Sequence, residues 1–320
     1  MGRRAEPRGA LTGRLAGSPT ADPRLGLYGP GSEAWRLDRE AVLLLGAGPR
    51  ALLMQIAHPL VAEGVDQHSS FRVDPWSRLQ ATLRSYLTIV YGSTPAARAE
   101  VARLRRRHAP VRGPVREVTA ATRFGASYTA ADPDLSLWVH ATLVDSTIVT
   151  YDRWLGPLSR ERAARFYAET VPVGRALGIP ADRLPADLAA FHAYLAGMLA
   201  PDGPVHPTPT ARELARHILH PPLEPLVPPL APILRLISPA AYDWTLWPAV
   251  DLLPASLREE YRIPWSRGRA LAATWLLAGW QAWRPLVPTW LRWMPQARAA
   301  DRRVAGVGDG AGGRAGRARA

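Results

Sequence analysis

Residues 132–154 have the sequence DPDLSLWVHATLVDSTIVTYDRW, which carries the clearest structural signal in the chain. Asp132 followed by Pro133 is a typical helix start, because the aspartate can cap the first turn and proline suits the first helical position. Between residues 135 and 151 the only charged residue is Asp145. A helix that is apolar on nearly every side is buried rather than amphipathic. The sequence therefore predicts a long buried helix here.

The same start signal recurs elsewhere and predicts helices over residues 76–91, after Asp74-Pro75, and 96–109, after Thr94-Pro95. Periodicity or capping predicts helices in three further segments: residues 158–177, residues 185–200, and the segment that Thr210 and Glu213 open as a capping box. Only residues 115–128 have the pattern of a short hairpin. The predicted fold class is mostly α, with one domain over residues 26–295 and disordered tails at 1–25 and 296–320.

Composition excludes several classes of protein. The chain has 320 residues, of which 47% are hydrophobic, enough for a substantial core. It has no cysteine, which excludes disulfide scaffolds, zinc fingers, iron–sulfur clusters and covalently attached haem. Of the formal charge of +13, the two tails carry +3 and +4 and the core +6. These charges are scattered arginines with acids among them, so no nucleic-acid partner is expected.

Neither end predicts a membrane span. Arg3-Arg4 is not followed by the apolar stretch of an export signal, so the expected location is cytoplasmic. Residues 270–283 form an apolar stretch of 14 residues, shorter than the roughly 20 that cross a bilayer. We interpret the tryptophans of residues 270–293 as packed inward on a terminal core helix. The alternative is a peripheral membrane contact through this segment.

Two histidines fall on the inner faces of predicted helices. His140 lies in the middle of the buried helix, where an unpaired imidazole costs roughly 1–3 kcal/mol. His108 falls on the apolar stripe of the helix over residues 96–109. Either imidazole can be a hydrogen-bonded core histidine. Taken together, they make a metal or haem site an equally good interpretation.

Arg78 and Thr82 lie four residues apart and therefore on one face of their helix. A guanidinium beside a hydroxyl suits the binding of an anionic or polarised oxygen group. The alternative is a helix-surface arginine with an incidental threonine.

Residues 46–51, with Gly46, Gly48 and Ala51, match a dinucleotide-binding pattern, which leaves a nucleotide-dependent enzyme as a rival interpretation. Other catalytic classes lack their motifs. No histidine has an acid three residues before it, as di-iron bundles require. The GxSxG elbow of serine hydrolases is also absent.

A set of dispersed, ordered motifs resembles the catalytic domain shared by rubber oxygenases (latex-clearing proteins) and MpaB-type oxygenases. The resemblance covers roughly residues 35–265. The motifs are GPRALLMQIAHP at 48–59, DQHSSF at 66–71, DP at 74–75, RLQAT at 78–82, His108, YTAADP at 128–133 and WVHAT at 138–142.

The resemblance implies a globin-like helical core that holds haem b without a covalent bond. His140 would be the axial iron ligand, Arg78 and Thr82 would lie on the distal side, and His108 would support the haem. The implied activity is that of a haem-dependent dioxygenase acting on an apolar alkene, with dioxygen as co-substrate. Glu63 or His68 would be a base, although a structural role is the simpler interpretation of both. The alternative is a haem carrier or sensor without turnover.

Three positions differ from the rubber-cleaving members of that family. Those members have basic residues where this chain has Leu137 and Val144, on either side of His140. They also have a lysine where this chain has Ala81. The expected substrate is therefore a small or membrane-partitioned isoprenoid or lipid-like alkene rather than bulk rubber.

Overall fold

Helices make up most of the fold in the computed structural model, which describes residues 22–69, 74–117, 126–220 and 246–315. This confirms the predicted fold class. Within those ranges the only sheet is an antiparallel pair, β1 (Arg112–Pro114) with β2 (Ser127–Thr129), in which Gly113 is opposite Tyr128. The strands flank the loop of the predicted hairpin. The predicted N-terminal tail lies almost wholly outside the described residues, which begin just before the short helix η1 (Pro23–Leu25).

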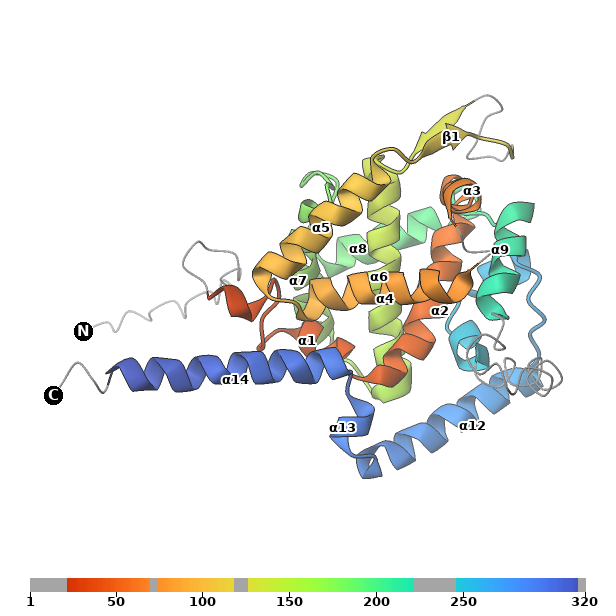
Figure 1. Cartoon of the computed structure of the whole chain (residues 1–320). Helices are drawn as coiled ribbons and strands as arrows, with labels where there is room; N and C mark the ends of the chain where they lie inside the picture. The colour runs from red at the N-terminus through yellow and green to blue at the C-terminus, as the bar shows by residue number, and fades with distance from the viewer. Residues whose placement is uncertain (1–21, 70–73, 118–125, 221–245, 316–320) are drawn as a thin grey trace, which may run out of the picture.

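The central element is α6 (Pro133–Leu155), which runs through the middle of the molecule (Figure 1). As predicted, Asp132 caps it, accepting a hydrogen bond from the amide of Asp134 at 2.8 Å. The helix α2 (Ala41–Ala57) packs along it more extensively than any other element. Buried Arg50 of α2 forms an ion pair with Asp145 at 2.7 Å, which neutralises the one charge in the apolar middle of α6.

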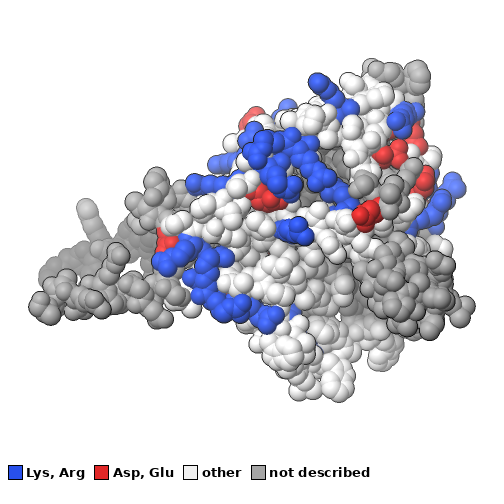
Figure 2. Space-filling model, viewed as in Figure 1, with Lys and Arg blue, Asp and Glu red and all other residues white. Residues whose placement is uncertain are grey.

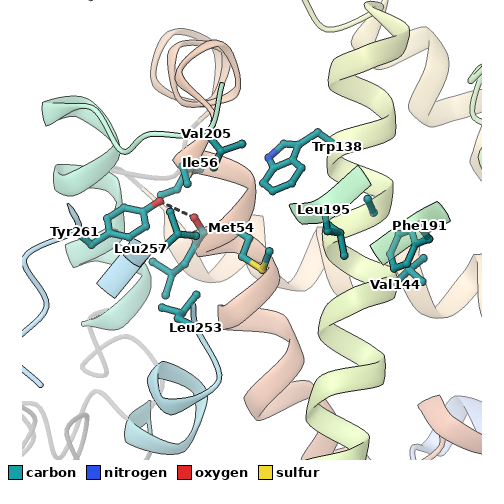
Figure 3. Close-up of a cluster of buried hydrophobic side chains, with 14 of the residues drawn as sticks. Met54, Ile56, Trp138, Val144, Phe191, Leu195, Val205, Leu253, Leu257 and Tyr261 are labelled. Carbon is teal, nitrogen blue, oxygen red and sulfur yellow. Dashed lines mark hydrogen bonds between the residues drawn. The ribbon is translucent and has the colours of Figure 1, made fainter. Parts of the chain in front are cut away.

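Further helices complete the core around α2 and α6. They are α1 (Glu33–Asp38), α7 (Arg160–Ala176), α8 (Leu188–Met198), α9 (Pro209–Leu219) and α11 (Ala255–Glu260). Figure 3 shows side chains of this cluster, among them Trp138 of α6, Met54 of α2 and Leu195 of α8. The hydroxyl of Tyr261 donates to the carbonyl of Leu53, so the one polar group of that ring is satisfied inside the core.

The helices α4 (Pro75–Tyr91) and α5 (Thr94–His108) pack against each other, and α4 crosses in front of α6 in Figure 1. Asp74 caps α4 as predicted, whereas Ser93 rather than Thr94 caps α5. α3 (Pro59–His68) follows α2 after a bend of 104° and contacts the β1–β2 ribbon.

The C-terminal elements depart from two expectations. α12 (Arg267–Trp283), η5 (Arg284–Leu286) and α13 (Thr289–Arg292) extend along one end of the molecule and lead into α14 (Pro295–Ala315). The prediction that the tryptophans of α12 and α13 pack inward is wrong for Trp275, Trp283 and Trp290, which are 60–75% exposed. The prediction of a disordered tail from residue 296 is wrong for the start of α14, where Ala297 and Ala300 are buried against α4 and α1 residues.

Two local predictions also change. Residues 46–51 lie inside α2 and do not form the loop between strand and helix that a dinucleotide site needs, so this rival interpretation is wrong. α9 is capped by Thr208, not Thr210, whose hydroxyl instead donates to Glu117. Among the described residues, no single helix is long and apolar enough to cross a membrane, and only the bent pair α2–α3 passes that test jointly.

Candidate active site

His140 is buried at the centre of α6 with an unsatisfied ring nitrogen. His140 is 7% exposed, and burial lowers the pKa of its imidazole to about 4. The ring is therefore neutral at physiological pH. Its Nε2 is shielded from water and has no hydrogen-bond partner among the described residues. A neutral imidazole with a free nitrogen is the form that binds a metal.

The space beside this nitrogen depends on a glycine of α7. A Cβ atom at Gly174 would lie 3.3 Å from Nε2 of His140 and 3.1 Å from a methyl group of Leu184. Both distances are shorter than ordinary contacts, so a side chain at position 174 would press on the imidazole. Leu137 and Val144, which lie on the same side of α6 as His140, are also buried. The surroundings of His140 are thus tightly packed and apolar.

Arg78 and Thr82 do lie together on α4. Nη1 of Arg78 donates to Oγ1 of Thr82 at 3.1 Å, and Nε donates to Oγ of Ser69 at 3.2 Å. Partial burial and the nearby charge of Arg107 lower the pKa of Arg78. No acidic side chain within the described ranges forms an ion pair with it. Arg78 is therefore a cation held by hydroxyl groups, with its charge available to an anionic oxygen.

His108 is close to Arg78 but does not face the core. The prediction that it lies on the inner stripe of its helix is wrong, because the last turn of α5 extends beyond the packed part and leaves the residue exposed. Partial shielding of the ring from water, together with the charges of Arg78 and Arg107, lowers the pKa of His108. The structure thus brings Arg78, Thr82 and His108 into one basic group at the α4–α5 surface.

A buried polar cluster, which the sequence did not reveal, joins α4 to α6. Asp38 of α1 is 3% exposed and hydrogen-bonds with Tyr86 of α4 and Thr147 of α6. Burial raises the pKa of Asp38 to about 7, and the two hydroxyl groups oppose that rise. Tyr86 continues the face of Arg78 and Thr82, and Thr147 continues that of His140. This spacing was the only available signal, since the three residues are far apart in the sequence.

The Asp38 cluster lies between the two halves of the candidate site, which are Arg78 with Thr82 on α4 and His140 on α6. Arg78 lies about two turns before Tyr86 on α4, and His140 lies two turns before Thr147 on α6. Because α4 and α6 cross at a steep angle (Figure 1), the two halves diverge from this contact. In the described part of the chain, no hydrogen bond joins His140 to Arg78, Thr82 or His108.

Glu63 and His68 have structural partners on the β1–β2 ribbon. The carboxylate of Glu63 accepts hydrogen bonds from the backbone amides of Arg116 and Glu117, at 2.7 and 3.0 Å. Nε2 of His68 lies 3.1 Å from the carbonyl of Arg112. Both side chains therefore hold the ribbon against α3, which favours their structural interpretation over a role as base.

The residues of the site are compatible with a haem. A haem needs one protein ligand at minimum, and His140 offers a buried, neutral imidazole with an unpaired Nε2. At Gly174 the backbone of α7 approaches that ring closely, with no side chain between them. Arg78 supplies a cation that no acid neutralises in the described ranges. These features suit a cofactor that is apolar over most of its surface and that also presents an anionic or oxygen-binding group.

Comparisons with known proteins identify the family of the chain. Residues 35–300 match the model of a family described as "ER-bound oxygenase mpaB/B'/Rubber oxygenase, catalytic domain". Uncharacterized proteins of Mycobacterium bovis and Mycobacterium tuberculosis are each 27% identical over 236 residues, covering 71% of this chain and 83% of theirs. No solved structure matches the chain. Because the family model spans most of the sequence, this chain belongs to the mpaB/rubber oxygenase catalytic domain family.

Proposed function

We propose that this oxygenase depends on haem b and acts on an apolar, alkene-containing substrate. His140 would hold the iron through Nε2. The observation that carries the proposal is the buried Nε2 of His140, which is the one imidazole nitrogen among the buried side-chain atoms that have no partner in the described residues. Its lowered pKa keeps the nitrogen unprotonated and available at neutral pH.

When bound, haem iron would supply the binding and activation of dioxygen. The task of the α4 residues is to stabilise the negative charge that develops on oxygen. Arg78 is suited to this because its guanidinium is oriented by Ser69 and Thr82 before any ligand arrives. The hydroxyl of Thr82 accepts from Arg78 and donates to the Arg78 carbonyl, so its position is fixed as well.

The surroundings of His140 support the proposed substrate class. Leu137 and Val144 are both less than 5% exposed and add no charge beside the imidazole. Pockets lined by such residues bind apolar molecules, which are oriented by a few polar groups. We infer a short isoprenoid or a lipid-like alkene rather than a polymer.

The first test is haem binding by His140→Ala, with His58→Asn as the matched control. His58 is also buried, and its pKa is also lowered to about 4, but its Nδ1 already accepts from the amide of Leu60. Both proteins are purified, loaded with haem and examined by visible spectroscopy and circular dichroism. We expect His140→Ala to lose the Soret band of a ligated haem and keep its helicity, and His58→Asn to keep both. An unchanged spectrum in His140→Ala would exclude His140 as the ligand.

The second test is turnover. Haem-loaded protein is incubated with short isoprenoids in detergent and, separately, with polyisoprene latex, while dioxygen uptake and carbonyl products are followed. Uptake with the short alkenes alone supports the proposal. Haem binding without any uptake would favour a carrier or sensor, and cleavage of latex alone would contradict the inferred substrate class.

A further inference from the structure

Most large apolar side chains that the described structure leaves exposed lie on α12, η5 and α13. Trp275, Trp283 and Trp290 are 75%, 67% and 60% exposed. The same segments expose four leucines: Leu271, Leu276, Leu286 and Leu291. We refer to these seven side chains as the α12–α13 surface. In Figure 2 the projection at the lower edge, where Figure 1 places these helices, is uncharged on the face in view.

The helix α12 is apolar both where it packs and where it faces outward. No charged residue occurs between residues 270 and 283, and only Ala273 and Leu277, one turn apart, are buried. A helix that is apolar all round normally lies in a protein core or in lipid. Within the described ranges, only a narrow stripe of α12 is buried. Exposed apolar surfaces of this extent mark binding sites in soluble proteins.

The segment that forms this surface carries charges of one sign. Residues 261–300 contain six arginines and no aspartate or glutamate. Arg262 and Arg267 are exposed at the start of α12. At the other end, Arg284 and Arg292 both contact Glu40 of the protein body, at 2.9 and 3.3 Å. A second copy of the chain would bring the same positive charge against this one, which disfavours self-association.

Exposed tryptophans, leucines and arginines without acids are the composition that suits the boundary between lipid headgroups and acyl chains. Arginines are attracted there by anionic lipids. An open apolar groove of about 440 Å³, lined by Ala272, Trp275, Leu276, Gly279 and Trp280, lies within the same face. With 17 residues, α12 is better suited to lie in the plane of this boundary than to cross a bilayer.

We propose that the α12–α13 surface docks the protein on a membrane that contains anionic lipid. The tryptophans and leucines enter the boundary region, and Arg262 and Arg267 face the headgroups. The inference goes beyond oxygen chemistry and does not depend on it. It corrects the expectation that these tryptophans form a core, because the part of the chain that the structure describes does not pack against them closely enough to bury them.

The test is flotation of the full chain with vesicles. One set contains phosphatidylcholine with phosphatidylglycerol, and the other contains phosphatidylcholine alone. The test variant is Trp275→Ser/Trp283→Ser/Trp290→Ser, and the matched control is Leu79→Ser, an exposed apolar residue of α4. We expect the wild type and the control to float with the anionic vesicles. The triple variant should bind these vesicles at least about tenfold more weakly. A further variant, Arg262→Gln/Arg267→Gln, should lose the preference for anionic over neutral vesicles.

Three results would overturn the proposal. One is a wild-type protein that does not float with anionic vesicles. Another is a triple variant that floats as well as the wild type. A third is a wild-type dimer in solution, without vesicle binding, that becomes a monomer in the triple variant, because the surface would then join two copies. Flotation needs neither haem nor substrate, so its failure and a failure of the oxygenase proposal can be told apart.

Discussion

Replacing His140 with leucine should make the apoprotein more stable while it abolishes haem binding. In the apoprotein, Nε2 of His140 is buried without a hydrogen bond to any of the described residues. Leaving such a group unsatisfied costs about 1–3 kcal/mol. Leucine removes the polar atom at similar volume, and an apolar exchange of similar size usually costs less than about 1.5 kcal/mol in packing. The free energy of unfolding should therefore rise by about 1 kcal/mol.

The assay is denaturant unfolding of wild-type and His140→Leu apoprotein, followed by titration of each with haem. An increase of about 1 kcal/mol corresponds to a melting point raised by about 2 °C for a domain of this size. The wild type should gain stability on adding haem, because a ligand that binds only the folded state stabilises it, and the variant should not. A variant that is less stable by several kcal/mol would show that His140 has a structural role. A variant that still gains stability and a ligated Soret band would refute the axial assignment.

Four further changes test neighbouring features. Arg78→Ala should keep haem but lower turnover roughly 100-fold, since removing one preorganised donor to an oxyanion costs about 2.7–4 kcal/mol of barrier; loss of haem and helicity together would make Arg78 structural. Gly174→Ala should reduce haem affinity in a spectroscopic titration while leaving the melting point nearly unchanged, because the new methyl group would lie 3.3 Å from the imidazole while alanine favours the helix; wild-type affinity would contradict this. Arg50→Met should lower the free energy of unfolding by about 3–5 kcal/mol in denaturant titrations, because it strands a buried carboxylate; a loss below about 1 kcal/mol would contradict the buried pair. The pKa of Asp38 rises to about 7 in the folded state, so wild-type stability should fall as pH rises from about 4 to 7, and Asp38→Asn should remove up to about 4 kcal/mol of that fall; parallel pH profiles for the two proteins would refute it.

Part of the candidate site was accessible from the sequence because it depends on spacing within one helix. Arg78 and Thr82 are four residues apart, and the structure joins them by the hydrogen bond that this spacing allows. His140 was correctly placed in a buried helix because nearly all of its neighbours in the sequence are apolar. His108 was misplaced, since periodicity identifies a face of a helix but not how far along the helix a partner extends.

The cluster of Asp38, Tyr86 and Thr147 shows why the remainder of the site needed the fold. Its members come from three helices, and no short-range pattern connects them. The same holds for Arg50 and Asp145, whose pairing explains two buried charges at once. Each of these polar groups is tolerable only with its partner, and only tertiary packing supplies that partner.

The sequence by itself determined the helical class and the starts of α4 and α6, because a capping side chain and the proline after it act within a single turn. It also determined that residues 270–283 are apolar. Only the tertiary structure decided which apolar helix is buried: α6 is enclosed by α2, α7 and their neighbours, whereas α12, within the described ranges, buries only Ala273 and Leu277. Composition measures the preference of a segment for an apolar environment, but whether protein or lipid provides that environment depends on what packs against it.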